Sequence, residues 1–216
     1  MAPLMGGSTE RRSAFLGQHY PRKVELTDKT IVEVRPLKDT DEKRLAEFFA
    51  RLPFPERRLF KDDVANREVI AGWCRRLNYE TTLPLLAIDK DRIVADATLH
   101  REKRGWMSHV ARVRVSVDSD ARGRGLATRL IQEFIHIAPK FRIAILDAEI
   151  LIEQKGAMHV FEDLHFVNVA TLPQHALDLN HQAHDVLVYS LNVMQPEQLA
   201  VDPDEDPEHI DIGGAG

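Results

Sequence analysis

The sequence of 216 residues has a single cysteine, Cys74, so it cannot form an internal disulfide. A disulfide-rich secreted scaffold is therefore excluded, and a reducing compartment fits. No apolar run approaches the roughly 20 residues that a membrane-spanning helix needs. Residues 1–17 lack the apolar core of a signal peptide. We therefore expect a cytoplasmic protein with no membrane partner.

Extreme charge is also lacking. The formal net charge is -5, so bulk charge does not predict a nucleic-acid partner. Hydrophobic residues make up 44% and charged residues 29%, which is typical of a soluble globular protein. The length is sufficient for one domain with a substantial core.

The two ends of the sequence differ from its middle. Residues 1–18 are small, polar and basic, and we expect a flexible, poorly ordered segment. Residues 195–216 combine prolines, a block of acids and a glycine-rich end, which predicts a flexible acidic tail. Residues 19–194 are then expected to form one domain.

Hydrophobic periodicity changes in an orderly way between the two ends. Alternating or continuous apolar runs predict strands at 30–37, 83–89, 92–102, 109–117, 141–150, 166–172 and 183–193. Apolar residues spaced three and four apart predict helices at 39–52, 62–80 and 126–140, and a short one from 155. Strands in runs with helices between them predict an α/β fold with a mixed sheet.

The stretch DARGRGLATRL, residues 120–130, places Gly123 and Gly125 between a predicted strand and a predicted helix. A helix N-terminus offers free N–H donors and the positive end of the helix dipole, and glycine lets the backbone approach an oxyanion closely. Arg122, Arg124 and Arg129 add positive charge. The loop is either a phosphate or pyrophosphate site, or a tight strand-to-helix turn with surface arginines.

Two common phosphate-binding motifs do not fit this loop. The dinucleotide fingerprint needs a third glycine where Thr128 stands, and the NTPase loop needs Gly-Lys-Ser/Thr. The pattern R-x-x-G-x-[GA], at Arg122, Gly125 and Ala127, resembles the acetyl-CoA motif of the GNAT superfamily of N-acetyltransferases. This resemblance implies a GNAT-like fold, with a mostly antiparallel central sheet and helices on both faces. It also implies that the loop holds the coenzyme A pyrophosphate and that the preceding strand pairs with the pantetheine arm.

A second motif of the family follows the next predicted strand. The stretch QKGAMHVFEDLHF resembles N-x-x-A-x-x-[LV]-Y-x-x-x-G-F, with Phe161 at the position of the tyrosine that protonates the leaving thiolate in many members. Phenylalanine cannot donate a proton, so another group or water would have to serve. The residues that the resemblance assigns to acetyl-CoA are Val115, Val117, Arg122, Gly123, Arg124, Gly125, Leu126, Ala127, Thr128 and Phe161.

The resemblance implies direct attack of a primary amine on acetyl-CoA, without an acyl-enzyme. We interpret Cys74 as a core residue. Glu149 stands twelve residues before Phe161, where some relatives carry a catalytic base. His109 is the second candidate base, and Asp147, Glu102 and Asp96 are lesser ones. No metal is expected, because no complete ligand set has metal-binding spacing.

The acceptor is left open between a protein lysine and a small amine. Residues 20–52 resemble the lead-in of bacterial protein lysine acetyltransferases, with Tyr20-Pro21, Arg35-Pro36 and Phe48-Phe49. A different class of function also stays open: an acetyl-CoA-binding regulatory or interaction module that has weak or lost catalysis. The oligomeric state is open as well, with a homodimer as one option.

Overall fold

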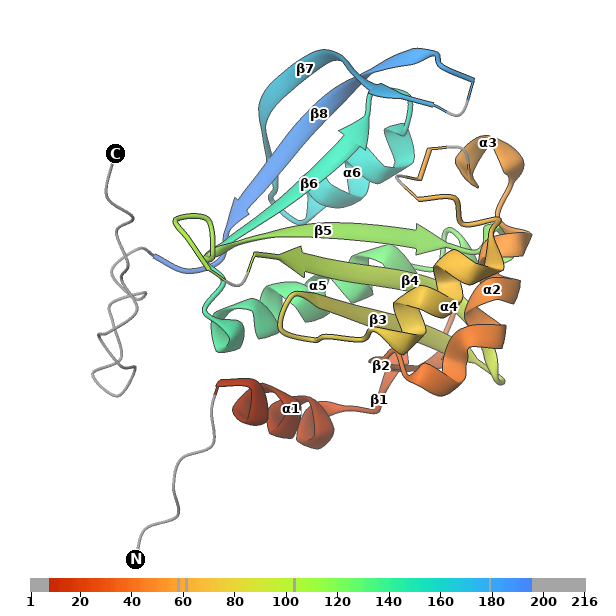
Figure 1. The fold of residues 1–216 in the computed structure, drawn as a ribbon, viewed down its shortest axis with the longest axis vertical. Coiled ribbons are helices and arrows are strands. Elements are labelled where there is room, and N and C mark those ends of the chain that lie inside the picture. The colour runs from red at the N-terminus through yellow and green to blue at the C-terminus, as the bar shows by residue number, and fades with distance from the viewer. Residues whose placement is uncertain (1–7, 58, 61, 103, 179, 196–216) are drawn as a thin grey trace, which may run out of the picture.

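The computed structural model describes residues 8–57, 59–60, 62–102, 104–178 and 180–195. A sheet of eight strands crosses the molecule, in the order β1-β2-β3-β4-β5-β6-β8-β7 (Figure 1). The strands are β1 (Arg22–Glu25), β2 (Ile31–Pro36), β3 (Thr82–Asp89), β4 (Arg92–Arg101), β5 (Val110–Val117), β6 (Ile145–Leu151), β7 (Val167–Leu177) and β8 (Ala183–Asn192).

Every pair of neighbouring strands is antiparallel except one. β5 and β6 pair in parallel, over Val110–Arg112 and Ile145–Asp147 only. β4 pairs with β5 over most of its length, with Ala95 opposite Val117 and Arg101 opposite Ala111. The predicted mixed, mostly antiparallel sheet is confirmed.

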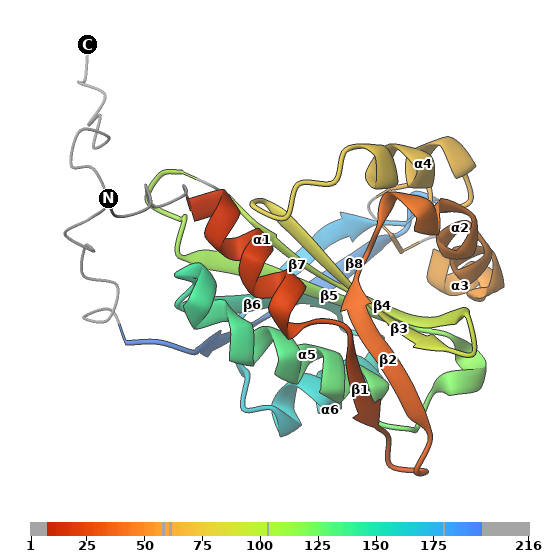
Figure 2. The same cartoon turned by 90° about the horizontal axis from the view of Figure 1, so that it is seen from below.

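Helices cover both faces of the sheet (Figure 2). The helices are α1 (Ser8–His19), α2 (Glu42–Arg51), α3 (Phe54–Arg57), α4 (Arg67–Arg75), α5 (Leu126–Ile137) and α6 (Lys155–Asp163). α5 packs with α1 and α6 against one large apolar cluster, and α2 and α4 enclose a smaller one on the other face. The prediction of helices on both faces is therefore confirmed.

The central strand β3 shows why helices must pack on both faces of the sheet. Six of its eight residues are buried, so its sequence is a continuous apolar run and not an alternating one. Leu85 and Ala87 belong to the α5 cluster, and Leu86 and Ile88 belong to the α2/α4 cluster. Burial on alternate faces is what the two-residue period of a strand requires.

The helix α1 differs from the poorly ordered segment predicted for residues 1–18. Leu16 is buried in the α5 cluster, and the Phe15 ring packs edge-on against Phe141 with 6.1 Å between centroids. Arg12 donates a hydrogen bond of 3.0 Å to Glu80. The partners of this helix lie far along the chain, so local composition did not show that it could be stabilised.

One further boundary differs from the predicted one. The helix predicted over 62–80 is shorter, because the Asn66 side chain accepts a hydrogen bond from the Glu68 N–H and caps α4 at its start. The predicted tail, residues 195–216, lies outside the described residues apart from Gln195. Within the described part of the chain, no helix is long and apolar enough to cross a membrane.

Candidate active site

The glycine loop joins the end of β5 to the start of α5. β5 ends at Val117, a 3-10 turn covers Ser119–Ala121, and α5 begins at Leu126. Gly123 and Gly125 have φ angles of +71° and +80°. A side chain in this left-handed region is strained, so the turn itself requires both glycines.

The loop leaves a row of backbone donors without a protein acceptor. Among the residues that the structure describes, none accepts a hydrogen bond from the backbone N–H groups of residues 123–128. These groups stand at the N-terminus of the 12-residue helix α5, where the helix dipole is positive. The arrangement can hold an anionic group such as a pyrophosphate.

The loop arginines bind parts of the protein in the structure. Arg122 donates two hydrogen bonds of 3.2 Å to the Val117 carbonyl and forms an ion pair with Glu56. Arg124 donates to the Asp120 carbonyl over 2.9 Å. Both side chains therefore fix the shape of the loop, while the backbone N–H groups stay free for a ligand.

The buried carboxylate of Asp118 stabilises the start of the loop. Asp118 accepts hydrogen bonds of 2.7 Å from Arg51 on α2 and from Arg92 on β4. Burial acts to raise the pKa of Asp118, but these two guanidinium groups hold it below its usual value. The Thr27 N–H also donates to the Arg124 carbonyl, so the β1–β2 turn supports the other side of the loop.

The strands β5 and β6 separate on the way to the loop. Their pairing ends at Arg112 and Asp147, and Figure 1 shows them together at one end and apart at the other. The rest of β5, including Val115 and Val117, pairs with β4 alone. This half of β5 therefore has one edge without a strand partner, and an extended group could pair with it.

The two predicted bases lie at different places along these strands. Glu149 is on the separated half of β6, where its carboxylate forms an ion pair of 3.0 Å with Arg112. His109 precedes β5, and its carbonyl accepts hydrogen bonds from Ala144 and Ile145 at the end where the strands are paired. Glu149 lies four residues of extended chain, about 13 Å, beyond Ile145, whose N–H donates to the His109 carbonyl. The structure therefore does not bring the two bases together.

Phe161 is part of the core. Its side chain is 3% exposed and packs edge-on against Phe166, with 4.9 Å between ring centroids. It lies on α6, which follows β6 directly. The ring offers no proton donor, and its cluster is the one that also holds α5.

A pocket of about 300 Å³ lies on the other face of the sheet, between α4 and the strands β3, β4 and β5. Its apolar wall consists of Leu37, Leu45, Phe49, Phe60, Trp73 and Leu77. Its polar lining includes Asp62, Arg76, Asp96, Thr98, His100 and Arg114. Val115 and Ser116 also line it, so the pocket reaches the half of β5 that β6 leaves unpaired.

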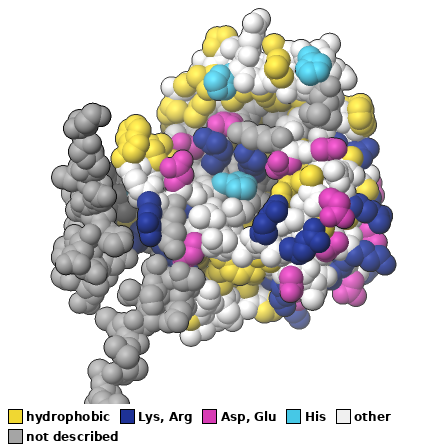
Figure 3. All heavy atoms as spheres, viewed as in Figure 1, with side chains coloured by type: hydrophobic (Ala, Val, Ile, Leu, Met, Phe, Trp, Pro, Cys, Tyr) yellow, Lys and Arg dark blue, Asp and Glu magenta, His cyan; other side chains and the backbone are white. Residues whose placement is uncertain are grey.

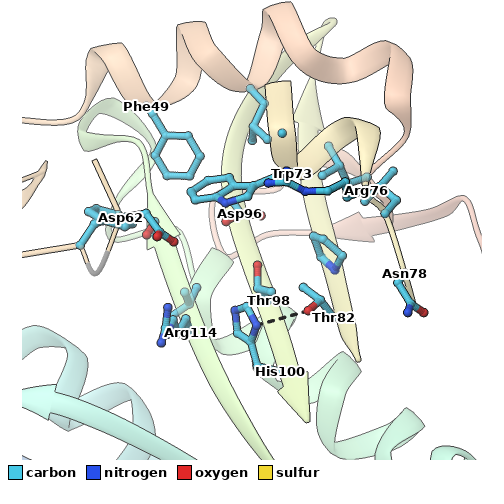
Figure 4. A pocket seen from close by; sticks show the side chains of 18 residues that line it. Phe49, Asp62, Trp73, Arg76, Asn78, Thr82, Asp96, Thr98, His100 and Arg114 are labelled. Carbon is cyan, nitrogen blue, oxygen red and sulfur yellow. Dashed lines mark hydrogen bonds between the residues drawn. The ribbon is translucent and has the colours of Figure 1, made fainter. Parts of the chain in front are cut away.

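Asp96 lies on the floor of this pocket. Figure 4 shows its carboxylate beside Trp73, with Thr98 and His100 following along the same strand. Burial raises the pKa of Asp96 to about 7, although a hydrogen bond with Thr98 acts in the opposite direction. A carboxyl group with such a pKa is partly ionised near neutral pH and can accept a proton from a ligand.

Arg114 brings a positive charge to the same pocket (Figure 4). Burial lowers the pKa of Arg114, and the neighbouring Arg112 lowers it further, while Glu149 and Asp62 act in the opposite direction. On this side of the molecule, basic and acidic side chains are intermixed, and no single sign covers the surface (Figure 3).

The family comparison agrees with this geometry. The model of the acetyltransferase (GNAT) family matches residues 41–166, from the start of α2 to the end of the second motif. That range is more than half of the chain. The chain belongs to the GNAT acetyltransferase family. No curated protein matches the sequence.

Solved structures show that this GNAT chain shares its fold with distant relatives. The GNAT domain of S. lividans PAT is 19% identical, with a TM-score of 0.66 over 80% of this chain and 98% of that one. The ribosomal-protein-S5-alanine acetyltransferase of Vibrio fischeri is also 19% identical, with a TM-score of 0.66 over 74% and 92%. The protein yncA of Salmonella typhimurium, solved with its cofactor acetyl-CoA, is 14% identical, with a TM-score of 0.65 over 76% and 95%.

In this GNAT domain the predicted coenzyme residues lie at one end of β5, except Phe161, which is buried on α6. The pocket beside them was not predicted as a unit, although Asp96 was named as a lesser option. Its sequence signal is an acid inside the otherwise apolar stretch IVADATL. Trp73 and Arg114 had no such signal, because the packing of α4 over β5 brings them together and local sequence does not show it.

Proposed function

We propose that this protein is an N-acetyltransferase that moves an acetyl group from acetyl-CoA to a primary amine. The observation that carries the proposal is the row of N–H groups at residues 123–128, which have no acceptor among the described residues. It lies next to an edge of β5 that no described strand covers and a pocket that contains Asp96. This reaction needs a site for the anionic pyrophosphate, a strand edge for the extended arm of the coenzyme, and a proton acceptor.

The residues of the loop and of β5 fit coenzyme A. The N–H groups of Gly123–Thr128 would hold the pyrophosphate, and the free edge at Val115 and Val117 would pair with the pantetheine arm. Acetyl-CoA supplies the activated thioester. The chain supplies its orientation, with the acetyl end toward the pocket that Val115 and Ser116 share.

Asp96 is the proton acceptor that we propose for the attacking amine. The amine must lose a proton as its nitrogen bonds to the carbonyl carbon, and a carboxylate with a pKa of about 7 can take that proton near neutral pH. Glu149 is the rival base. It would have to give up its ion pair with Arg112 in order to act, since protonation removes its charge.

The leaving thiolate has no donor at the family's usual position. Phe161 is buried and has no hydroxyl, so we propose that water protonates the thiolate. Cys74 does not enter the reaction, because it is buried in the α2/α4 cluster and burial raises the pKa of its thiol to about 11. Transfer by direct attack is consistent with both observations.

A second candidate function is an acetyl-CoA-binding module without catalysis. The buried Phe161 favours it, since this chain lacks the proton donor that many members of the family use. The two functions share the coenzyme site and differ only in turnover.

One pair of measurements separates these functions. Calorimetry with coenzyme A tests the loop, and release of free thiol from acetyl-CoA with a panel of amines and lysine peptides tests transfer. Binding together with amine-dependent thiol release supports a transferase. Binding without release from any acceptor supports the module, and absence of binding contradicts both.

A further inference from the structure

The pocket lining carries the carboxyl group of Asp96 and the guanidinium of Arg114. Asp96 has a hydrogen bond with Thr98, and the charges of Glu149 and Asp62 attract the Arg114 guanidinium. Both residues are half-buried, and charged groups partly withdrawn from water in a pocket are candidates for contact with a ligand. A ligand that carries both signs of charge would complete the two groups together.

The sheet register puts the two residues on the same face of the sheet. Asp96 is opposite Ser116, and Thr98 is opposite Arg114, so Asp96 and Arg114 are diagonal neighbours on one face. Diagonal neighbours lie about 7–8 Å apart at their α-carbons, which long side chains can span. A small molecule between them would meet a carboxylate and a guanidinium at once.

The other side chains of the pocket indicate what kind of side chain that molecule carries. The six apolar side chains of its wall include the rings of Phe49, Phe60 and Trp73. The volume of about 300 Å³ is at the lower end of the range for small-molecule sites. Arg76 and Asp62 add one further charge of each sign at the lining. The pocket thus matches a small zwitterionic head group with an apolar side chain.

We propose that the acceptor is an α-amino acid with an apolar or aromatic side chain, whose carboxylate binds Arg114 and whose amine faces Asp96. This inference rests on the proposed transferase function and narrows its acceptor. A guanidinium binds a carboxylate through two parallel hydrogen bonds, which also fixes the amine in place. A lysine side chain brings a second cation next to Arg114 and no anion, so the pocket disfavours it.

Leucine and leucinamide form a matched pair of probes. They have the same side chain and nearly the same size, but the amide lacks the carboxylate. Chemistry alone favours the amide, because its amine loses a proton more easily than that of the free acid. We expect kcat/KM for thiol release to be at least tenfold higher with leucine than with leucinamide, isoamylamine or a lysine peptide.

The Arg114→Gln variant tests the residue itself. It should abolish the preference for leucine over leucinamide while leaving coenzyme A affinity unchanged. Arg75→Gln, on the exposed side of α4, is the matched control and should keep the preference. If the wild type uses leucinamide or the peptide as well as leucine, transfer stands and the amino-acid assignment is overturned. Retention of the preference in Arg114→Gln overturns it too.

A binding measurement separates this inference from the function on which it rests. Titration with leucine or leucinamide in the presence of coenzyme A can be followed by fluorescence in a Trp106→Phe variant, whose remaining tryptophan is Trp73 in the pocket wall. Leucine binding without thiol release would support the amino-acid pocket and contradict the transferase. Equal binding of the two probes, or no binding, would overturn the pocket assignment.

Discussion

The two faces of the sheet are filled in different ways. On the α5 face, Leu130, Ile131, Phe134 and Ile137 are fully buried against the strands, and the cluster is continuous. On the α2/α4 face, the cluster is smaller and a pocket remains beside it, with Asp96 on its floor. One face is packed for stability, and the other keeps space and charge that stability alone does not need.

This difference assigns separate tasks to the two faces. The packed α5 fixes the position of its own N-terminus and thus the row of N–H groups of the glycine loop. The α2/α4 face, which we call the hollow face because it contains the pocket, supplies the groups that would contact the acceptor. β5 connects them, since Ala111 and Val113 are buried in the α5 cluster while Arg114 and Ser116 line the pocket. Substitutions on the two faces should therefore damage different properties.

The largest expected effect is on stability, on the packed face. Leu130→Ala removes a fully buried side chain from α5, and such truncations typically cost about 2–5 kcal/mol. For a chain of this size that loss lowers Tm by about 2–4 °C per kcal/mol. Thermal unfolding measures it.

Leu77→Ala is the matched truncation on the hollow face, where Leu77 is half-buried. The Leu77 side chain removes less apolar area from water than the Leu130 side chain does. We therefore expect Leu77→Ala to lower Tm by less than half as much as Leu130→Ala. Equal losses at the two positions would contradict the contrast between a packed face and an open one.

Asp96→Asn should have the largest effect on turnover. It keeps the shape of the side chain and removes the proton acceptor, so we expect a fall of about 10²-fold or more in kcat, with coenzyme A affinity unchanged. The rate of the wild type should rise as pH passes through about 7, and this limb should vanish in the variant.

Glu149→Gln is the decisive comparison for that assignment. If Asp96 is the base, this variant keeps the pH profile and loses only the ion pair with Arg112, an effect of less than about 1 kcal/mol for a partly exposed pair. If the acidic limb disappears in Glu149→Gln and persists in Asp96→Asn, the base is Glu149.

Gly125→Ala should weaken coenzyme binding by about tenfold, which corresponds to about 1.4 kcal/mol. The φ angle of +80° disfavours any side chain, and the new Cβ would lie 3.2 Å from the Thr27 Cγ2. The loop would have to move, and its N–H groups with it. Gly17→Ala on α1 is the control, because a Cβ added there would meet nothing within 4 Å, and calorimetry should give wild-type affinity.

The sequence predicted one end of β5 far better than the other side of the sheet. The glycine loop, the helix after it and the strand before it are contiguous, so periodicity and glycine spacing were sufficient. The pocket combines Trp73 from α4, Asp96 from β4 and Arg114 from β5. Those residues meet only through tertiary packing, and local patterns carry no information about it.

The helix α1 and the proposed base are two further cases in which local sequence does not reveal tertiary contacts. Phe15 and Leu16 gave no clear signal in a basic segment, because Phe141 and the α5 cluster that stabilise them lie far along the chain. Counting from a motif pointed to Glu149, but counting could not reveal that Arg112 pairs with it. Burial and ion pairing decide which carboxylate can accept a proton, and both depend on the folded state.

A pH-dependent difference in stability is also expected at Asp96. In the folded protein the carboxyl group keeps its proton up to a pH of about 7, whereas its ordinary pKa is 3.8. The folded state therefore binds more protons than the unfolded chain between these values, and stability present at low pH is lost as pH rises through about 7.

Asp96→Asn removes this titration, so the stability of the variant relative to the wild type should rise as the pH increases. We expect a relative gain of at least about 1 kcal/mol between pH 5 and pH 8.5, seen as about 2–4 °C in the difference between the two Tm values. Thermal unfolding of both proteins across this range measures it. Parallel curves would mean that Asp96 is ionised throughout, and the proton acceptor of the pocket would then have to be sought elsewhere in its lining.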